Sequence, residues 1–283
     1  MVSLVVPGSS ERMLTKARTL AADEIVIDLE DAVVAERKPE ALQSTVAALG
    51  DPFAAARVSV RVNAPGTPWC HHELIALAAR PGRLHSVILP KVDGGGDLAF
   101  ADRLLTGAEG GGKRLALTAL IETAQGLANL AEITTASSRL DGLILGYADL
   151  SVSLGRSPAG RDDLDRWLAI QDAVLVAARA AGLKAIDGPH LSIDDLEGLA
   201  AAARRAAENG FDGKWAIHPA QIEPIRRAFA PTEEQVAHAR AVLDALARGA
   251  ELGGGAVALD GEMLDEPVRL AALRTLQRAG VAA

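Results

Sequence analysis

The sequence predicts a (β/α)8 TIM barrel followed by a C-terminal helical arm. Eight short aliphatic runs alternate with longer segments of helical period along most of the 283 residues. Each run consists largely of Val, Ile and Leu without strict polar alternation, which is typical of a parallel strand buried on both faces. Eight repeats favour a closed barrel, and this length is ordinary for one. The periodicity alone also fits an open doubly wound sheet, because it does not show closure.

The expected strands are the aliphatic runs themselves, at 3–7, 24–31, 57–63, 84–91, 114–122, 141–149, 183–188 and 211–219. Helical periodicity between them is clearest at 11–22, 36–49, 123–137 and 194–208. This order of strand, helix and strand is that of parallel α/β folds. We therefore assign residues 1–230 to the barrel.

The remaining segment, 231–283, exceeds what a barrel needs. A proline–threonine pair followed by two glutamates is typical of a helix start, and we expect this helix to end near Gly249. The glycine-containing stretch 253–267 is expected to be flexible and mixed, and a last helix is expected over 267–279. We predict that this extension is a lid or an arm that packs on a neighbouring subunit.

Composition excludes several classes of protein. The chain has 37 acidic and 29 basic residues, a net charge of −8, which argues against a duplex nucleic-acid binder. No apolar run approaches the length of a membrane span, and the N-terminus lacks the basic region of a signal peptide. The single cysteine permits no internal disulfide. We expect a soluble cytoplasmic protein with no membrane or nucleic-acid partner.

Two motif-like stretches do not hold up. GAEGGGKR at 107–114 has the Gly and Lys spacing of a phosphate-binding loop, but arginine replaces the required Ser or Thr and the segment leads from helix to strand. WCHHE at 69–73 looks like a metal or thiolate site, but adjacent helical residues do not face one another and no second His follows at the zinc-binding spacing. We interpret them as a loop and a helix start. A serine nucleophile motif is also absent from the sequence, so acyl-enzyme chemistry is not supported.

Charged residues stand at the C-terminal end of nearly every predicted strand, and a proline and a glycine end the first. In a (β/α)8 barrel these positions converge on one face, where active sites of this fold lie. Single residues there also serve as helix caps or solvated loop residues, so the argument depends on the whole set. The set comprises Pro7, Gly8, Glu30, Asp31, Arg61, Asn63, Lys91, Glu122, Asp149, Asp187 and His218.

The residue types in this set indicate a particular chemistry. Glu122 and Asp149 end neighbouring strands, and two carboxylates without a Cys or His pair suit a hard cation such as Mg²⁺, with Mn²⁺ as the alternative. Arg61 across the mouth suits bidentate binding of a substrate carboxylate. Together they predict a site for a 2-oxo acid chelated to the metal, which would act as a Lewis acid.

Eight motifs are spread along the chain in a recognisable order and spacing. They are VPGSSERMLTKA, DLEDAV, RVN, LPK, IETAQG, GYADL, GFDGKWAIHPAQI and GEMLDEP. By this ordered set the chain resembles the HpcH/HpaI aldolase–citrate lyase superfamily, in particular its citrate lyase β-subunit-like branch of malyl-CoA and citramalyl-CoA lyases. The resemblance covers essentially the whole chain.

The resemblance implies roles for the barrel residues. Glu122 and Asp149 would be the Mg²⁺ ligands, and Arg61 would bind the oxo-acid carboxylate. Glu30 and Asp31 would lie beside that substrate and order the metal-bound waters.

The resemblance also implies a coenzyme A site and a composite active site. Arg12 and Lys16, one helical turn apart, fall where family members contact coenzyme A, and Ile217 and His218 line that side. Asp265 matches a catalytic aspartate that family lyases supply from the C-terminal arm of a neighbouring subunit in a homotrimer. The competing interpretation of Asp265 is a helix N-cap.

One motif departs from the family pattern, in which Gly-Ala-Glu-Asp-Leu is more common than GYADL. Tyr147 and Ala148 replace the middle pair. If the position contributes only backbone N–H groups the change is mild, and if the side chain matters the substrate preference differs.

The leading hypothesis is a Mg²⁺-dependent carbon–carbon lyase that cleaves or forms malyl-, citramalyl- or citryl-CoA, giving acetyl-CoA and a 2-oxo acid. Alternatives are a citrate lyase β-subunit acting on an acyl-carrier-protein thioester, an aldolase for free pyruvate, and a non-catalytic barrel that binds a carrier or partner subunit. Arg12, Lys16 and the long tail argue against the pyruvate aldolase. Four polar residues argue against the non-catalytic barrel, namely Arg61, Glu122, Asp149 and Asp265. The sequence leaves open the oxo acid, its stereochemistry and the natural direction.

Overall fold

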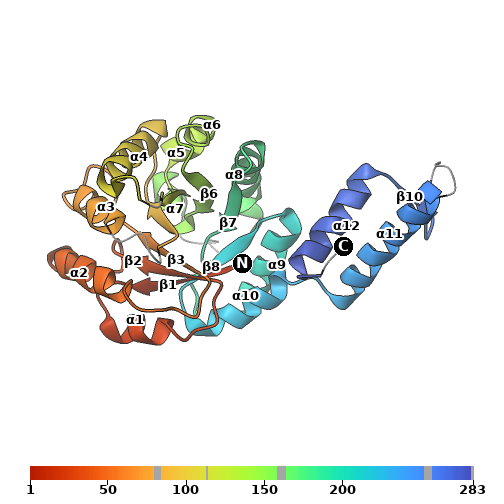
Figure 1. Ribbon diagram of the computed structural model, residues 1–283, viewed down its shortest axis with the longest axis horizontal. Coiled ribbons are helices and arrows are strands. Elements are labelled where there is room, and N and C mark those ends of the chain that lie inside the picture. The colour runs from red at the N-terminus through yellow and green to blue at the C-terminus, as the bar shows by residue number, and fades with distance from the viewer. Residues whose placement is uncertain (80–83, 113, 158–163, 252–256, 282–283) are drawn as a thin grey trace. The chain divides into compact units, whose positions relative to one another are not determined.

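The computed structural model describes residues 1–283 except 80–83, 113, 158–163, 252–256 and 282–283. Contacts between Cα atoms divide the chain into two compact units, Met1–Arg226 and Arg227–Ala283 (Figure 1). Among the described residues, no helix combines the length and the apolar character needed to cross a membrane.

The first unit is a closed barrel of eight parallel strands in sequence order, in which β1 pairs with both β2 and β8. This closure confirms the predicted (β/α)8 barrel and rules out the open doubly wound sheet. The strands are β1 (Val2–Pro7), β2 (Glu24–Asp28), β3 (Arg57–Arg61), β4 (Ser86–Leu89), β5 (Ala116–Ile121), β6 (Leu140–Leu145), β7 (Lys184–Asp187) and β8 (Gly213–Ala216).

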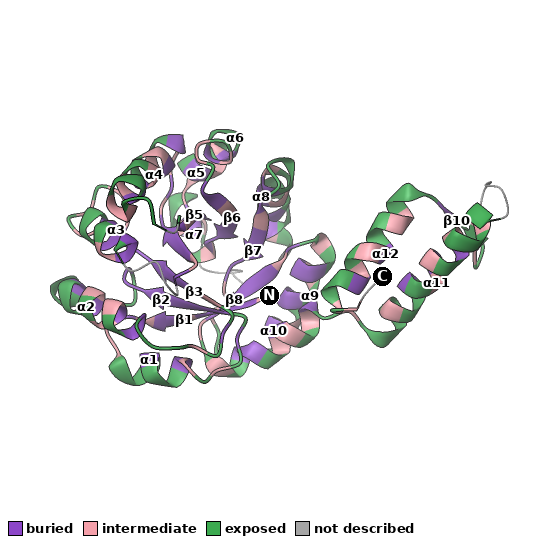
Figure 2. Ribbon diagram, in the orientation of Figure 1, coloured by how far each residue is buried: buried purple, intermediate pink, exposed green. Residues whose placement is uncertain are grey.

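Helices surround the barrel and bury only their inner faces, so Figure 2 shows buried strands and green outer helix surfaces. In α8, for example, Ile170, Val174 and Ala178 recur at helical spacing and are all buried. The helices are α1 (Glu11–Ala17), α2 (Lys38–Ala48), α3 (Cys70–Ala78), α4 (Gly95–Glu109), α5 (Ala124–Ala128), α6 (Leu130–Ile133), α7 (Tyr147–Ser153), α8 (Leu168–Ala180), α9 (Leu196–Asn209) and α10 (Ile222–Phe229), with 3₁₀ turns η1 (Ala35–Arg37), η2 (Leu164–Trp167) and η3 (Pro219–Gln221).

The barrel interior is layered from a polar floor to a charged mouth. Alternate residues of a strand face the same side, so β5 and the residue that follows it direct Thr118, Leu120 and Glu122 inward in turn. Thr118 belongs to the floor, where its hydroxyl contacts Ser86 and Asp141. Leu120 belongs to an apolar layer that separates floor and mouth, made of Val26, Ile88, Leu120, Ile144, Ile186 and Trp215. The site residues stand on this layer.

Two helices differ from the expected ranges. The single helix expected over 123–137 is instead α5 and α6, because Asn129 between them has φ −101° and ψ 18° and its side-chain amide donates to the Asp93 carbonyl. The helix expected over 11–22 ends at Ala17. The 107–114 stretch leads from helix to strand, as expected, but only part of it is a loop. Residues 107–109 end α4, and residues 110–112 and 114 connect α4 to β5, with residue 113 outside the described residues.

The second unit consists of α11 (Glu233–Glu251), a β-hairpin and α12 (Glu266–Arg278). The prediction of a flexible, mixed stretch over 253–267 is wrong for its described part, because β9 (Val257–Leu259) and β10 (Glu262–Leu264) pair antiparallel. Their connection, Asp260–Gly261, has φ of 51° and 87°, as in the two-residue turns favoured by Asp-Gly in hairpins. The glycines at 253–255 lie outside the described residues. A small apolar core joins the elements, formed by Ala239, Val242, Ala245, Leu264, Ala272 and Leu276.

Candidate active site

Two carboxylates end neighbouring strands at the C-terminal mouth of the barrel. Glu122 directly follows β5 and is 2% exposed, and Asp149 lies in the first turn of α7, after β6. Gly146, which begins that turn, leaves the space that Glu122 needs, since a Cβ there would lie 2.6 Å from the Glu122 Cβ. The glycine of the GYADL motif therefore has a packing reason.

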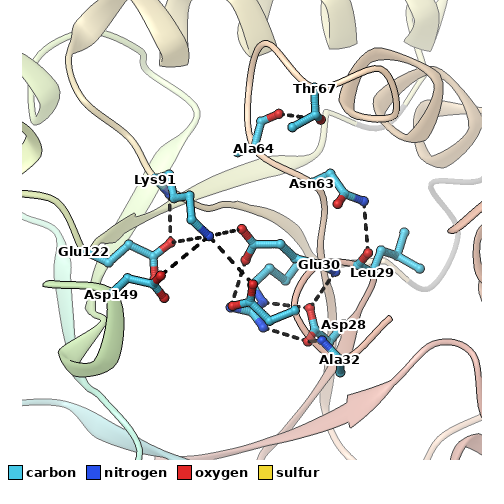
Figure 3. A network of polar contacts seen from close by, with 12 residues as sticks. Asp28, Leu29, Glu30, Ala32, Asn63, Ala64, Thr67, Lys91, Glu122 and Asp149 are labelled. Atoms are coloured by element: carbon cyan, nitrogen blue, oxygen red, sulfur yellow. Dashed lines mark hydrogen bonds and ion pairs between the residues drawn. The ribbon is translucent and has the colours of Figure 1, made fainter. Parts of the chain in front are cut away.

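Lys91 lies between these carboxylates and a third one. Its backbone N–H donates to Glu122 Oε1 at 2.9 Å. Its ammonium is 2.5 Å from Glu30 Oε1 and 4.0 Å from both Glu122 Oε1 and Asp149 Oδ1 (Figure 3). The φ of Lys91 is 50°, a left-handed conformation that is costly for a residue with a Cβ. This turn lets one residue direct both its N–H and its side chain at the cluster.

The crowding of carboxylates changes their acidity. Burial, followed by the charges of Glu30 and Asp149, raises the pKa of Glu122 to about 8 despite the nearby cations. Burial likewise raises the pKa of Glu30, although Arg61 and Lys91 oppose the shift. Burial acts to lower the pKa of Lys91, but the hydrogen bond to Glu30 and the neighbouring carboxylates raise it overall. Around Glu122 the neighbouring cations, Lys91 and Arg61, therefore do not offset burial and the neighbouring carboxylates.

Arg61, at the end of β3, is held by Asp28 at the end of the adjacent β2. Its Nε and Nη2 donate to the two Asp28 carboxylate oxygens at 2.7 and 2.6 Å. Its Nη1 is 3.0 Å from Glu30 Oε2 and 3.3 Å from Asp31 Oδ2. Burial would lower the pKa of Arg61, but Asp28, Glu30 and Asp31 raise it. The Nε and Nη2 groups of Arg61 are thus both bonded to Asp28, whereas Nη1 faces the mouth carboxylates Glu30 and Asp31.

Asp28 is a site residue that the sequence analysis missed. It is 1% exposed and its oxygens also accept from the backbone N–H groups of Glu30 and Ala32. The available signal was the period of β2, which places Asp28 on the same inward side as Val26.

The residues expected on the coenzyme A side lie after two adjacent strands. Arg12 and Lys16 are exposed on α1, which follows β1, and Ile217 and His218 follow β8, which pairs with β1. The Ile217 N–H donates to Gln221 Oε1 at 2.8 Å, and the His218 ring accepts from the Ala220 N–H at 3.2 Å. This hydrogen bond makes His218 the cap of η3, and its side chain is exposed.

Tyr147, the departure from the family pattern, is half-buried, and its side chain makes specific contacts. Its hydroxyl donates to Asp187 and accepts from Gln171 Nε2. Its ring packs edge-on against Trp167 at a centroid distance of 4.8 Å. Burial and the Asp187 charge raise its pKa. These contacts fasten the start of α7, two residues before Asp149, beside a cavity of about 270 Å³.

Asp187 does not join the carboxylate cluster. Its other carboxylate oxygen is 2.5 Å from the buried Lys214 ammonium. Ile186 and Trp215 belong to the barrel interior, so their neighbours Asp187 and Lys214 face outward toward the helices.

Asp265 lies in the second unit, at the start of α12. Its carboxylate accepts from the Val268 N–H at 3.1 Å, so it is a helix N-cap. Pro267 follows within the first turn of α12. The local structure is the one expected from either interpretation of this residue.

A closed (β/α)8 barrel with five carboxyl groups and two cations gathered at its C-terminal mouth has the architecture of a barrel enzyme. The chain belongs to the HpcH/HpaI aldolase/citrate lyase family, whose sequence profile matches residues 2–219. The family and the lyases among its relatives make it a carbon–carbon lyase.

Three similar proteins illustrate the relationship. The L-malyl-CoA/beta-methylmalyl-CoA lyase of Rhodobacter capsulatus is 34% identical over 279 residues, covering 92% of this chain and 88% of that protein. The (3S)-malyl-CoA thioesterase of Cereibacter sphaeroides strain KD131 is 38% identical over 281 residues, covering 98% and 93%. The crystal structure of CitE from Mycobacterium tuberculosis with magnesium, acetoacetate and coenzyme A superposes with a TM-score of 0.81 at 35% identity, covering 99% and 97%.

Proposed function

We propose that this protein is a Mg²⁺-dependent lyase that cleaves or forms a 3-hydroxyacyl-CoA such as malyl-, citramalyl- or citryl-CoA, with acetyl-CoA and a 2-oxo acid as the other partners. The observation that carries the proposal is that Glu122 and Asp149 face one common point. Oxygens of both lie 4.0 Å from the same ammonium nitrogen of Lys91. The magnesium and coenzyme A in the related CitE structure support the same interpretation.

The donor set fits Mg²⁺. Glu122 is buried, has its pKa raised by burial and neighbouring negative charge, and gains from a cation beside it. In the part of the chain that the structure describes, no three Asp, Glu, His or Cys side chains are grouped to enclose a metal. A cation held by Glu122 and Asp149 would therefore keep several water or substrate ligands, as Mg²⁺ does. When bound, it would supply Lewis-acid stabilisation to an oxygen that gains negative charge.

The chain's own residues would bind and orient the oxo acid. Arg61 would offer its Nη1 edge to the substrate carboxylate, since Asp28 already occupies the fork made by Nε and Nη2. Glu30 and Asp31, 3.0 and 3.3 Å from Nη1, would border this carboxylate and orient water molecules. Asp28 fixes the plane of the guanidinium and so sets the direction of approach.

The coenzyme A moiety would run past Arg12 and Lys16 on α1 and past Ile217 and His218 after β8. Exposed cations suit its phosphates, and the strand pairing of β1 with β8 makes these loops neighbours. Asp265 would act in proton transfer at the acetyl-CoA methyl group, from the arm 231–283 of a neighbouring subunit in a homotrimer. General acid–base steps of this kind contribute roughly 10²–10⁴ in rate.

A second candidate is hydrolysis of the thioester, because one relative of 38% identity is named a (3S)-malyl-CoA thioesterase. The same metal and carboxylate site would bind the malyl group, but water would attack the thioester carbonyl instead of the carbon–carbon bond breaking. Either reaction would also be possible on an acyl-carrier-protein thioester, in which a partner protein replaces coenzyme A.

One assay separates lyase from thioesterase activity. The purified protein is incubated with Mg²⁺ and each of malyl-, citramalyl- and citryl-CoA, and acetyl-CoA, free coenzyme A and oxo acid are quantified by chromatography. Lyase activity gives acetyl-CoA and oxo acid in equal amounts, whereas thioesterase activity gives free coenzyme A and the hydroxy acid. Glu122→Gln is the site control and should abolish either activity. Turnover that is insensitive to both EDTA and Glu122→Gln would refute the proposed metal site.

A further inference from the structure

We propose that Lys91 is the resident counter-ion of the carboxylate cluster, and that it weakens the binding of free metal while strengthening the binding of the oxo acid to the metal-loaded protein. The inference rests on the proposed metal site at Glu122 and Asp149. It adds a residue whose positive charge would lower the affinity for the metal cation and raise the affinity for the substrate anion.

The geometry places Lys91 in competition with a metal. Its ammonium is 4.0 Å from one oxygen of each proposed ligand. A Mg²⁺ ion bound about 2.1 Å from those oxygens would lie roughly 2–6 Å from the ammonium nitrogen, the difference and the sum of the two distances. Two positive charges at this separation in a buried mouth repel strongly.

The ammonium is already bonded to a carboxylate that is not a proposed metal ligand. It is 2.5 Å from Glu30 Oε1 and 3.8 Å from Asp31 Oδ1. In Figure 3 Glu30 lies on the opposite side of the ammonium from Glu122 and Asp149. The Lys91 side chain is 35% exposed, so packing does not enclose it and its ammonium can shift toward Asp31. The Lys91 backbone N–H would stay on Glu122, because that contact does not depend on the side chain.

The charge balance gives the opposite effect on an anion. Five carboxyl groups lie at the mouth, those of Asp28, Glu30, Asp31, Glu122 and Asp149, and among the described residues their ion pairs are with Arg61 and Lys91. Loss of the ammonium would help a divalent cation and hinder a carboxylate substrate. A residue that merely held the fold would, on removal, weaken both ligands together.

The test compares Lys91→Met with wild type by isothermal calorimetry, using MgCl₂ alone and then pyruvate on the Mg²⁺-saturated protein. We expect Mg²⁺ to bind at least tenfold tighter and pyruvate at least tenfold weaker in the variant. Lys91→Arg keeps the charge and should stay within about threefold of wild type for both ligands. The matched control is Lys184→Met. Lys184 begins β7, at the opposite end of the strand from the mouth; its side chain is half-exposed and its ammonium is 3.9 Å from Asp141. This substitution should change neither affinity.

The outcomes are distinguishable. Unchanged or weaker Mg²⁺ binding by a folded Lys91→Met variant, with wild type binding normally, overturns the inference and leaves the proposed function intact. If Lys91→Met does not fold, a tenfold change in either affinity in Lys91→Arg overturns it, whereas near-wild-type values support it. Absence of Mg²⁺ binding by wild type, by calorimetry and by thermal stabilisation, refutes the metal site and with it this inference.

Discussion

Replacing Glu122 by glutamine should stabilise the metal-free protein, and the gain should grow with pH. Glutamine has the same shape and keeps an oxygen that accepts the Lys91 N–H, but it carries no charge. Burial and the charges of Glu30 and Asp149 raise the pKa of Glu122 to about 8, against 4.5 for an ordinary glutamate. The ionised carboxylate therefore lowers the free energy of unfolding, and the substitution removes this destabilising effect.

The sign and size follow from proton linkage. Between pH 4.5 and about 8 the folded protein holds a proton on Glu122 that the unfolded chain has lost, so unfolding releases it. The free energy of unfolding contributed by this group then falls by about 1.4 kcal/mol per pH unit. From pH 5 to pH 7 the stability of Glu122→Gln relative to wild type should rise by roughly 3 kcal/mol.

Urea unfolding in EDTA at pH 5, 6 and 7 measures this difference. Addition of Mg²⁺ should then raise the stability of wild type but not of the variant, because a ligand that binds only the folded state stabilises it. Glu73→Gln is a control for the metal response: Glu73 is also buried with a raised pKa, but it contacts Asn63, so Mg²⁺ should still stabilise that variant. Parallel pH curves for wild type and Glu122→Gln would refute the reasoning.

Three further predictions address single contacts. Arg61→Lys should lose pyruvate affinity by about 1.5–3 kcal/mol in calorimetry, because lysine cannot replace the paired hydrogen bonds to Asp28 that orient the group; unchanged affinity would contradict the role. Tyr147→Phe should lower the free energy of unfolding in urea by about 1–3 kcal/mol, because buried Asp187 loses a donor, and an unchanged midpoint would contradict this. Asp265→Asn should keep the helix cap but lose roughly 10²–10⁴ in turnover, whereas Asp265→Ala should also cost about 1 kcal/mol in stability. Mixing Asp265→Asn with Arg61→Ala subunits should restore activity if the arm acts across subunits, and no recovery after verified exchange would argue against it.

The barrel was predictable because parallel strands buried on both faces leave an aliphatic signature that repeats. The meeting of Glu122 and Asp149 followed from the same signature, since each stands where a run ends. The hairpin at 257–264 was also within reach of the sequence, because Asp-Gly between alternating apolar residues is a strong hairpin signal. Interpreting the neighbouring glycines as a sign of flexibility obscured it.

The sequence alone did not predict which side chains of the site bond to one another. Asp28 and Arg61 bond because the β2–β3 register sets them opposite each other, and a shift of one residue would turn Arg61 away from the interior. The left-handed turn at Lys91 is equally hidden, since no sequence pattern marks a lysine with φ of 50°. Both features depend on tertiary contacts that override local preference.

The layered interior explains how the barrel tolerates so concentrated a charge. The apolar layer around Leu120 separates the mouth from the floor carboxylates, so the two groups of acids do not share one buried space. Floor acids are satisfied within the protein: Asp141, for instance, contacts Thr118 and Arg57, and these partners help to lower its pKa despite burial. Glu122 at the mouth has the opposite shift, so it is the position where the fold leaves a charge for a ligand to balance. Stability and binding are therefore opposed at this residue, and the Glu122→Gln comparison measures both.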